Sequence, residues 1–321
     1  MDRVVRLGLV GGGRWGRIYA KTLSRMEGVE LAALSSRNPE NRDFAPAGCL
    51  STSNWRDLIE MAATDGRLDG LIVAVPPAAQ VEIAEAAVEA GLPTLLEKPV
   101  AMDTASARRL LQLAVSRKSF VMVDHTQLFN PAFRHLRDCL AALGGASAVK
   151  QINASAGNWG PFRSNIPVLW DWGAHEIAMT LDIMGRMPSA ANATILERRD
   201  EEGGIGERVE IQLQFDTVSA VICLNNMSQD KFRLFEVQAG DNHFRYDGVG
   251  EQNFAAKPAS AGNWEYIKLE DSLPLDIVIK NFAKGIQAGS SGHEGLCLGA
   301  DVVAVLESCQ AAQKSKQPVS I

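Results

Sequence analysis

A glycine pattern near the amino terminus has the spacing of a phosphate-binding turn. The pattern G-x-G-x-x-G follows the apolar run Val4–Val10 and is formed by Gly11, Gly13 and Gly16. The first glycine permits a tight turn, the second lets the backbone approach a pyrophosphate, and the third lets the following helix pack on the strand. The start of that helix presents N–H groups and a positive dipole to the phosphates. We therefore predict a dinucleotide site that includes Arg14 and Trp15; a turn without a ligand is the alternative.

The end of the second predicted strand bears on the choice between NAD and NADP. The run Val29–Ser35 is followed by Ser36 and Arg37, where no acidic residue stands. An acid at this place would bond both ribose hydroxyls, as NAD sites prefer. A serine hydroxyl and a guanidinium can instead hold a 2′-phosphate. We therefore expect NADP(H) to be favoured over NAD(H); the alternative is a loop arginine that points to solvent.

A lysine follows the fourth predicted strand. Glu97, Lys98 and Pro99 come directly after Thr94–Leu96. Ligands bind in the crevice at the carboxyl ends of parallel strands, so Lys98 could donate a hydrogen bond to a substrate oxygen and stabilise a developing alkoxide. Glu97 could hold the ammonium in place and belongs to the predicted cofactor site. The alternative is a surface lysine beside a turn proline.

A second group of chemical residues lies in the sequence LWDWGAHE. On a helix, Asp171 and His175 would lie four residues apart and share one face. An aspartate can orient an imidazole, and an imidazole can exchange a proton with a hydroxyl near neutral pH. Asp171 and His175 could therefore act together on a proton. A helix cap and a partly buried histidine are the alternative, and Trp172 either lines the pocket or fills the core.

Strand-like runs alternate with helical patterns through the first 124 residues. The runs are Val4–Val10, Val29–Ser35, Leu71–Val75, Thr94–Leu96 and Phe120–Val123. Such alternation is typical of an α/β fold, here an N-terminal Rossmann domain with a doubly wound parallel sheet. We therefore assign residues 1–124 to an NAD(P)-binding domain.

The pattern changes after residue 124. Helical candidates begin at Asn130 and His175, and two more, at 275–288 and 294–313, close the chain. Between them, alternating runs follow one another without helices: Glu207–Phe215, Val218–Leu224, Phe232–Val237, His243–Tyr246 and Tyr266–Leu269. We expect a C-terminal α+β domain, 125–321, with an open, mostly antiparallel sheet that is covered on one face.

Composition excludes several classes of protein. The length of 321 residues indicates two domains or one large one. The residues are 46% hydrophobic and 22% charged, which indicates a globular chain with a sizeable core, and the net charge is −6. No basic run points to nucleic acid, and no stretch of about 18 apolar residues points to a membrane span. The five cysteines form no C-x-x-C pair, so we expect reduced thiols in a cytoplasmic protein. No His, Asp or Cys spacing suggests a metal.

Four motifs together resemble the glucose–fructose oxidoreductase/inositol dehydrogenase/MocA (Gfo/Idh/MocA) family. They are GGGRWG at 11–16, VPP at 75–77, EKP at 97–99 and the pair Asp171 and His175. The resemblance covers essentially the whole chain. It implies a Lys98–Pro99 peptide that is often cis and a D-x-x-x-H pair that faces the nicotinamide. The resemblance thus implies His175 as the general acid/base and Asp171 as its partner or a substrate contact.

The resemblance also implies further site residues. The loop at Pro76 would pass beside the cofactor, and Gln80 stands near the place of a histidine in several members. A glutamine can hydrogen-bond there but cannot titrate. His125 and Asn130 are possible substrate contacts, although strand-end and helix-cap roles are at least as plausible for them.

The sequence thus predicts an NADP(H)-preferring oxidoreductase. It would transfer a hydride between the nicotinamide and a secondary alcohol or ketone of a substrate bound between the two domains. The resemblance implies that this substrate is a sugar, a cyclitol or a nucleotide-sugar-like polyol. By resemblance the protein would form a homodimer or homotetramer through the C-terminal sheet. The alternatives are a non-catalytic NAD(P)-binding sensor or scaffold, and a family member that uses tightly bound NAD to cleave a glycosidic bond.

Overall fold

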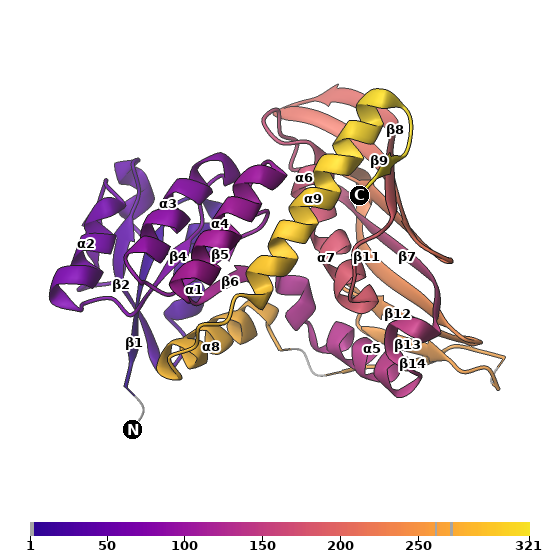
Figure 1. The fold of residues 1–321 in the computed structure, drawn as a ribbon, viewed down its shortest axis with the longest axis horizontal. Coiled ribbons are helices and arrows are strands. Elements are labelled where there is room, and N and C mark those ends of the chain that lie inside the picture. The colour runs from indigo at the N-terminus through magenta and orange to yellow at the C-terminus, as the bar shows by residue number, and fades with distance from the viewer. Residues whose placement is uncertain (1–2, 261, 270–271) are drawn as a thin grey trace. The chain divides into compact units, whose positions relative to one another are not determined.

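The computed structural model describes residues 3–260, 262–269 and 272–321 (Figure 1). The chain forms two compact units. The first consists of Met1–His125 with Leu273–Val303, and the second of Thr126–Ser272 with Ala304–Ile321. We predicted a single cut after residue 124, whereas here a late segment of the chain returns to the first unit.

The first unit contains a six-stranded, entirely parallel sheet with the order β3-β2-β1-β4-β5-β6. Its strands are β1 (Val5–Val10), β2 (Val29–Ser35), β3 (Leu50–Thr52), β4 (Gly70–Val73), β5 (Thr94–Glu97) and β6 (Val121–Asp124). This is the doubly wound order, in which the topology reverses between β1 and β4. The predicted Rossmann fold is confirmed. We did not predict β3, which is an edge strand of three residues in which Leu50 is 45% exposed.

Helices connect these strands, as the sequence pattern predicted. They are α1 (Arg14–Leu23), α2 (Arg56–Asp65), α3 (Pro77–Glu89) and α4 (Thr104–Arg117), with a short 3-10 helix, η1 (Pro39–Arg42), after β2. The start of α4 is set by Asp103, whose carboxylate accepts the Ser106 N–H at 2.7 Å. This N-cap satisfies a helix-start donor that would otherwise lack a partner.

The late segment joins the first unit through aromatic packing. It comprises α8 (Pro274–Gln287) and the first part of α9 (Glu294–Ser315). Phe282 is fully buried and stacks on Phe120 with ring centroids 5.6 Å apart. Gly70 of β4 leaves the space that Phe282 and Ile286 fill, since a Cβ there would lie 2.7 Å from Ile286. An apolar helix face therefore completes the core of a sheet that precedes it by 150 residues or more of sequence.

The second unit contains a nine-stranded sheet with the order β14-β13-β12-β11-β7-β10-β9-β8-β15. All its pairings are antiparallel except β7 with β10. The strands are β7 (Val149–Trp159), β8 (Ala190–Glu201), β9 (Gly204–Phe215), β10 (Val218–Asn225), β11 (Met227–Ala239), β12 (Asn242–Asp247), β13 (Phe254–Lys257), β14 (Glu265–Ile267) and β15 (Val319–Ser320). The predicted open, mostly antiparallel sheet is confirmed.

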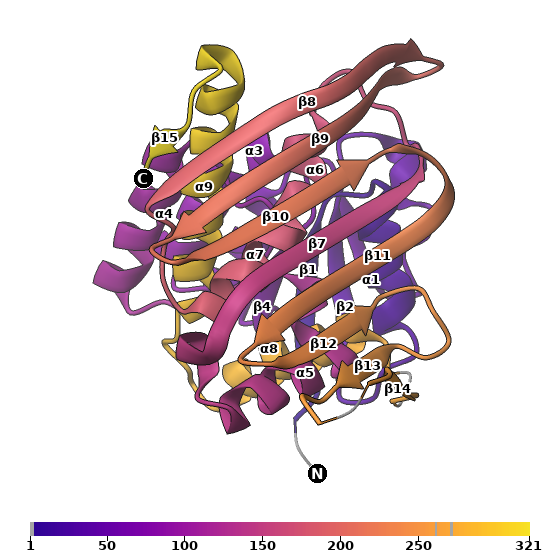
Figure 2. The same ribbon diagram turned by 90° about the vertical axis from the view of Figure 1, so that its right-hand side faces the viewer.

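One face of this sheet is covered by helices, including α5 (Pro131–Ala142), the short α6 (Val168–Asp171) and α7 (Gly173–Met184). Two 3-10 helices, η2 (Thr126–Phe129) and η3 (Gly145–Ala148), flank α5 in the chain. Along β10 every second residue is buried, which is the pattern of a strand with one covered face. Figure 2 shows the other face, over which no described element of this unit lies.

The helix α9 is long and apolar enough to cross a membrane when judged by length and composition alone. The core helix of a soluble protein meets the same criterion, and half of the relevant stretch is buried here. Val302, Val305 and Leu306 are fully buried. From the sequence alone we expected no stretch of about 18 apolar residues that points to a membrane span.

Replacement of Phe282 by alanine tests the return of the late segment to the first unit. Loss of a fully buried ring should lower the free energy of unfolding by about 3–5 kcal/mol, measured by urea denaturation. Phe162→Ala, which removes a half-buried ring in the second unit, is the control and should cost less. A Phe282→Ala protein as stable as the control would contradict the packing described here.

Candidate functional site

A cavity of about 680 Å³ lies in the first unit at the carboxyl ends of β1, β2 and β4. It is lined by the β1–α1 turn, the residues after β2 and the start of α3. These residues include Val10, Gly11, Gly12, Gly13, Ser35, Ser36, Arg37, Asn38, Asn41, Ala74, Val75, Pro76, Ala79 and Glu82. This is the crevice of an open parallel sheet, where its topology reverses and ligands bind. The predicted residues Gly11, Gly13, Ser36, Arg37 and Pro76 all line it.

The glycines of the turn have separate structural roles. Gly11 has a φ of +111°, and a Cβ there would lie 2.2 Å from the backbone oxygen of Ala74. A Cβ at Gly16 would lie 1.9 Å from the backbone oxygen of Gly11. Gly13 differs, because a Cβ there meets no atom within 4 Å. Gly11 and Gly16 are therefore needed by the fold, whereas Gly13 leaves open space beside the cavity.

The start of α1 suits an anion. Its N-cap is Gly13, which supplies no side-chain hydrogen bond, and its first turn contains no acidic residue. The N–H groups and the positive dipole end are therefore available to a phosphate. Arg14 and Trp15 form this first turn but do not line the cavity. The cavity volume, the open space at Gly13 and the uncapped helix together fit a dinucleotide.

The cavity wall after β2 is cationic. Ser36 is 9% exposed, and the Arg37 side chain is exposed and makes no hydrogen bond or ion pair with any residue that the structure describes. Glu82 enters the wall from α3, but its carboxylate pairs with Arg56 at 2.6 Å. The place at which NAD sites carry an acid therefore holds a hydroxyl and a guanidinium.

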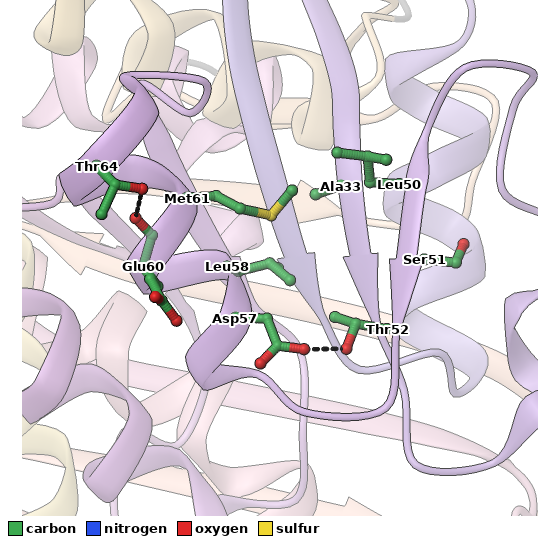
Figure 3. Close-up of a pocket in the computed structure, with 9 residues that line it drawn as sticks. All are labelled: Ala33, Leu50, Ser51, Thr52, Asp57, Leu58, Glu60, Met61 and Thr64. Carbon is green, nitrogen blue, oxygen red and sulfur yellow. Dashed lines mark hydrogen bonds between the residues drawn. The ribbon is translucent and has the colours of Figure 1, made fainter.

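A second, smaller cavity lies between α2 and the β2–β3 edge of the same sheet (Figure 3). Its volume is about 380 Å³. Its polar groups are hydroxyls and the acids Asp57 and Glu60, and the Thr52 hydroxyl bonds Asp57. A wall with carboxylates and no cationic side chain does not suit phosphate, so this cavity is not the dinucleotide site.

The turn after β5 carries Lys98. The Lys98–Pro99 peptide is cis, as the family resemblance implies. The Lys98 side chain is half-buried, and its backbone N–H donates to Glu97 Oε2 at 3.2 Å. Gln80 is fully buried, and its Nε2 donates to the backbone oxygens of Glu97 at 2.6 Å and Pro99 at 3.1 Å. Gln80, which we predicted as a cofactor contact, lies outside the cavity lining and holds the lysine-bearing turn in place.

Tyr19 and Asp124 lie beside this turn, and sequence reasoning gave neither a role in the site. The Tyr19 hydroxyl donates to Asp124 Oδ2 at 2.5 Å, and both residues are fully buried. Burial, followed by the charge of Asp124, raises the pKa of Glu97 to about 8, although Lys98 opposes this shift. The sequence signal was available, because Asp124 ends a buried strand at the carboxyl edge of the sheet.

His125, a predicted substrate contact, is 2% exposed. Neither ring nitrogen has a hydrogen-bond partner among the residues that the structure describes. Burial, reinforced by the positive charge of Lys98, lowers the pKa of His125 to about 3, so the ring stays neutral. Asn130 has a structural role, since its side chain accepts the Ala132 N–H at 2.9 Å and caps α5.

Asp171 and His175 belong to the second unit and do not lie on one continuous helix. Asp171 ends α6, and α7 starts at Gly173 after a break at Trp172. The predicted spacing on one unbroken helix is therefore not found, because Trp172 separates the two elements. The Asp171 carboxylate lies 3.6 Å from Arg163 Nε, and the His175 and Trp172 side chains are half-buried.

Two buried carboxylates hold α6 and α7 on the sheet. Glu207 of β9 is 3% exposed, and its Oε2 accepts the Val168 N–H at the start of α6 at 3.0 Å. Glu176 of α7 is 1% exposed and lies 2.9 Å from Arg233 Nε of β11. These contacts fix the segment that carries Asp171 and His175.

The described residues contain no group of three or more His, Cys, Asp or Glu side chains that could hold a metal ion. All five cysteines are free thiols.

Comparison with known proteins identifies the class. Residues 5–125 match the model of an oxidoreductase family with an NAD-binding Rossmann fold, Gfo/Idh/MocA. A crystal structure from Magnetospirillum magnetotacticum, of a protein provisionally named an oxidoreductase, is 36% identical with a TM-score of 0.86, and the match covers 95% of this chain and 99% of that one. The chain belongs to the Gfo/Idh/MocA family of oxidoreductases.

Two curated relatives are characterised by name. The rhizopine catabolism protein MocA of Rhizobium meliloti is 30% identical over 138 residues, which cover 43% of this chain and 42% of MocA. Inositol 2-dehydrogenase of Rhizobium meliloti is 24% identical over 230 residues, which cover 69% of this chain and 68% of that protein. The chain thus spans less than half the length of MocA.

Alanine substitutions at Gly13 and Gly16 separate the two kinds of glycine. Gly16→Ala should destabilise the protein by more than about 2 kcal/mol, because its methyl group would collide with backbone. Gly13→Ala should cost at most about 1 kcal/mol as a changed N-cap, yet raise the dissociation constant for NADPH by roughly tenfold or more, because the methyl group would occupy the phosphate space. Thermal denaturation and fluorescence titration measure the two effects. Unchanged NADPH binding by Gly13→Ala would argue against the assigned cavity.

Proposed function

We propose that this protein is an NADP(H)-preferring oxidoreductase that acts on a secondary alcohol or ketone of a sugar, cyclitol or nucleotide-sugar-like substrate. The observation that carries the proposal is the cavity at the topological switch of the parallel sheet, with the open space at Gly13 and the uncapped start of α1. Membership of an oxidoreductase family supports redox chemistry at that site. The substrate class is supported by the relative named inositol 2-dehydrogenase.

The preference for NADP(H) rests on Ser36 and Arg37. Both line the cavity after β2, and Arg37 has no other described ion-pair partner that would hold it away from a ligand. A guanidinium binds a phosphate with two parallel charge-assisted hydrogen bonds, whereas it gains little from a 2′-hydroxyl. Arg14, Trp15 and Glu97 complete the cofactor site in this proposal.

The catalytic groups are assigned as Lys98, His175 and Asp171. Bound NADP(H) would supply or accept the hydride. Lys98 would donate a hydrogen bond to the substrate oxygen, and its charge would stabilise the alkoxide that forms as the hydroxyl loses its proton. His175 would accept that proton in the oxidation direction and return it in reduction, with Asp171 as its partner. His125 and Trp172 are assigned to the substrate, and the two unpartnered ring nitrogens of His125 support a polar ligand beside it.

Two features of the structure bear on the oligomeric state and the cellular location of the protein. The uncovered face of the nine-stranded sheet in the second unit supports a homodimer or homotetramer formed through that sheet. The five free thiols fit a cytoplasmic location.

Two competing functions are a non-catalytic NAD(P)-binding sensor and a glycoside-cleaving family member with tightly held NAD. The cationic wall at Arg37 favours exchangeable NADP over the second of these.

The function is tested by an NADP(H)-coupled screen over sugars, cyclitols and nucleotide sugars. On a substrate found in that screen, Lys98→Met and His175→Asn should each lower kcat by about 100-fold or more, since each removes a group that acts in the transition state. NADPH binding should remain intact in His175→Asn. The controls are Lys21→Met and His293→Asn, which change the same residue types outside the site. Wild-type turnover by either catalytic variant would contradict the mechanism, and absence of any turnover with firm NADPH binding would favour a sensor.

Exchange of Arg37 for alanine tests the cofactor preference. Loss of charge-assisted hydrogen bonds to the 2′-phosphate should raise KM for NADPH by roughly 10- to 100-fold. KM for NADH should change little, because NADH lacks that phosphate. The matched control is Arg117→Ala, an exposed arginine in the last turn of α4. Equal changes in KM for the two cofactors would refute the assignment.

A further inference from the structure

A pair of carboxyl groups is buried directly beside Lys98. Glu97 ends β5 and Asp124 ends β6, and the two residues are partners in the register of these parallel strands. Partners on adjacent strands lie about 4.8 Å apart and point to the same face of the sheet. Glu97 is 7% exposed and Asp124 is fully buried. The sheet itself therefore brings two acids together out of contact with water.

Among the described residues whose effect on Glu97 is given, one carries a positive charge. Lys98, at the end of β5, is the cation that acts on Glu97. From α1, the Tyr19 hydroxyl donates to Asp124 at 2.5 Å. His125, which follows β6, stays neutral because burial, together with Lys98, lowers its pKa to about 3. From α3, Gln80 bonds only the backbone of the turn.

Helix α9 packs against β6, the strand that ends at Asp124, through glycines. A Cβ at Gly295 would lie 3.3 Å from the Val123 nitrogen, and one at Gly299 would lie 3.2 Å from Val123 Cγ2. These two positions bring no titratable side chain to the pair. Two adjacent carboxylates and one ammonium would leave an excess negative charge in a buried place, and such a charge is costly.

We propose that Glu97 and Asp124 share one proton at neutral pH and so position Lys98 beside a single negative charge. The hydrogen bonds distinguish the two acids. Tyr19 donates to Asp124 at 2.5 Å, which stabilises the ionised form of Asp124. Tyr19 also acts on Glu97 and opposes the rise of its pKa, but Glu97 Oε1 is buried without a hydrogen-bond partner among the described residues. Glu97 is therefore the acid that keeps the proton, and burial and the Asp124 charge raise its pKa to about 8.

The shared proton has a consequence for Lys98, and this step rests on the proposed function. With one negative charge beside it, the ammonium group keeps N–H donors for a substrate oxygen. When the pH rises and Glu97 loses its proton, a second carboxylate competes for those donors. The pair is thus a positioning device, and kcat/KM should fall as the pH passes through about 8.

The sharing of one proton by Glu97 and Asp124 can be tested in the absence of substrate and cofactor. In the full chain labelled with ¹³C at side-chain carboxyl carbons, NMR should show Glu97 titrating near pH 8, with its signal identified by loss in Glu97→Gln. Asp124→Asn removes the neighbouring charge and should lower that midpoint by about one unit or more. Tyr19→Phe should raise it, because the ionised pair loses a hydrogen bond. Both carboxyl groups titrating below about pH 5 in the wild type would overturn the proposal.

Control variants distinguish a specific effect on the carboxyl pair from a general loss of folding. Asp301→Asn removes an acid that pairs with Arg108 at 2.7 Å elsewhere in the first unit, and Tyr246→Phe removes a buried hydroxyl of the second unit. Both should leave the Glu97 midpoint unchanged; a shift equal to that of the pair's own variants would overturn the proposal. If Asp124→Asn does not fold, as circular dichroism reports, Tyr19→Phe carries the test.

Kinetics then test the effect on Lys98. On a substrate from the screen, Tyr19→Phe should move the alkaline fall of kcat/KM to higher pH, and Asp124→Asn should move it to lower pH, each in step with its NMR midpoint. A fall that stays in place while the midpoints move would overturn the positioning role. A shared proton seen by NMR in a protein without dehydrogenase activity supports the pair and contradicts only the proposed function.

Discussion

The close approach of α1 to β1 is the constraint on which the first unit depends. At Gly16 the helix lies against the backbone oxygen of Gly11, where even a methyl group would not fit. The left-handed φ of Gly11 turns the chain off the strand within the same few residues. This contact aims the uncapped end of α1 at the carboxyl edge of the sheet. The 680 Å³ cavity follows from it, because the helix cannot be tilted away without losing that packing.

The parallel sheet also decides which polar side chains meet. Every parallel strand ends at the same edge, so the residues after apolar runs gather there. Glu97 and Asp124 become neighbours in register, and Tyr19 reaches them from α1. Gln80 shows a second consequence, because its amide binds the turn that carries Lys98 from the start of α3. A buried amide that satisfies two backbone oxygens fixes a turn more firmly than a solvent-exposed contact would.

In the second unit, two buried carboxylates attach helices α6 and α7 to the sheet. Glu207 caps α6 from a strand, and Glu176 pairs with Arg233 across the covered face of the sheet. A buried ion pair such as Glu176–Arg233 contributes little net stability, but removal of one of its partners is costly. The contacts of Glu207 and Glu176 therefore specify the positions of α6 and α7 more than they stabilise these helices. The segment with Asp171 and His175 is defined by its attachments to the sheet, and the break at Trp172 gives each residue its own helix.

The glycine turn, the parallel and antiparallel sheets, the cap at Asn130 and the family could all be predicted from the sequence. These are local signals: side-chain periodicity, cap residues and motif spacing act within a few residues of the chain. It did not reveal β3, β7 and β8, whose short or polar stretches become strands only when neighbours pair with them. Nor did it show that α8 completes the core of the first unit. Three features became evident only from the folded chain: Gln80 holds the lysine turn, Asp171 and His175 stand on separate helices, and Tyr19, Glu97 and Asp124 form one buried group. Each of these depends on contacts between elements distant in the chain, and no local pattern of residues encodes them.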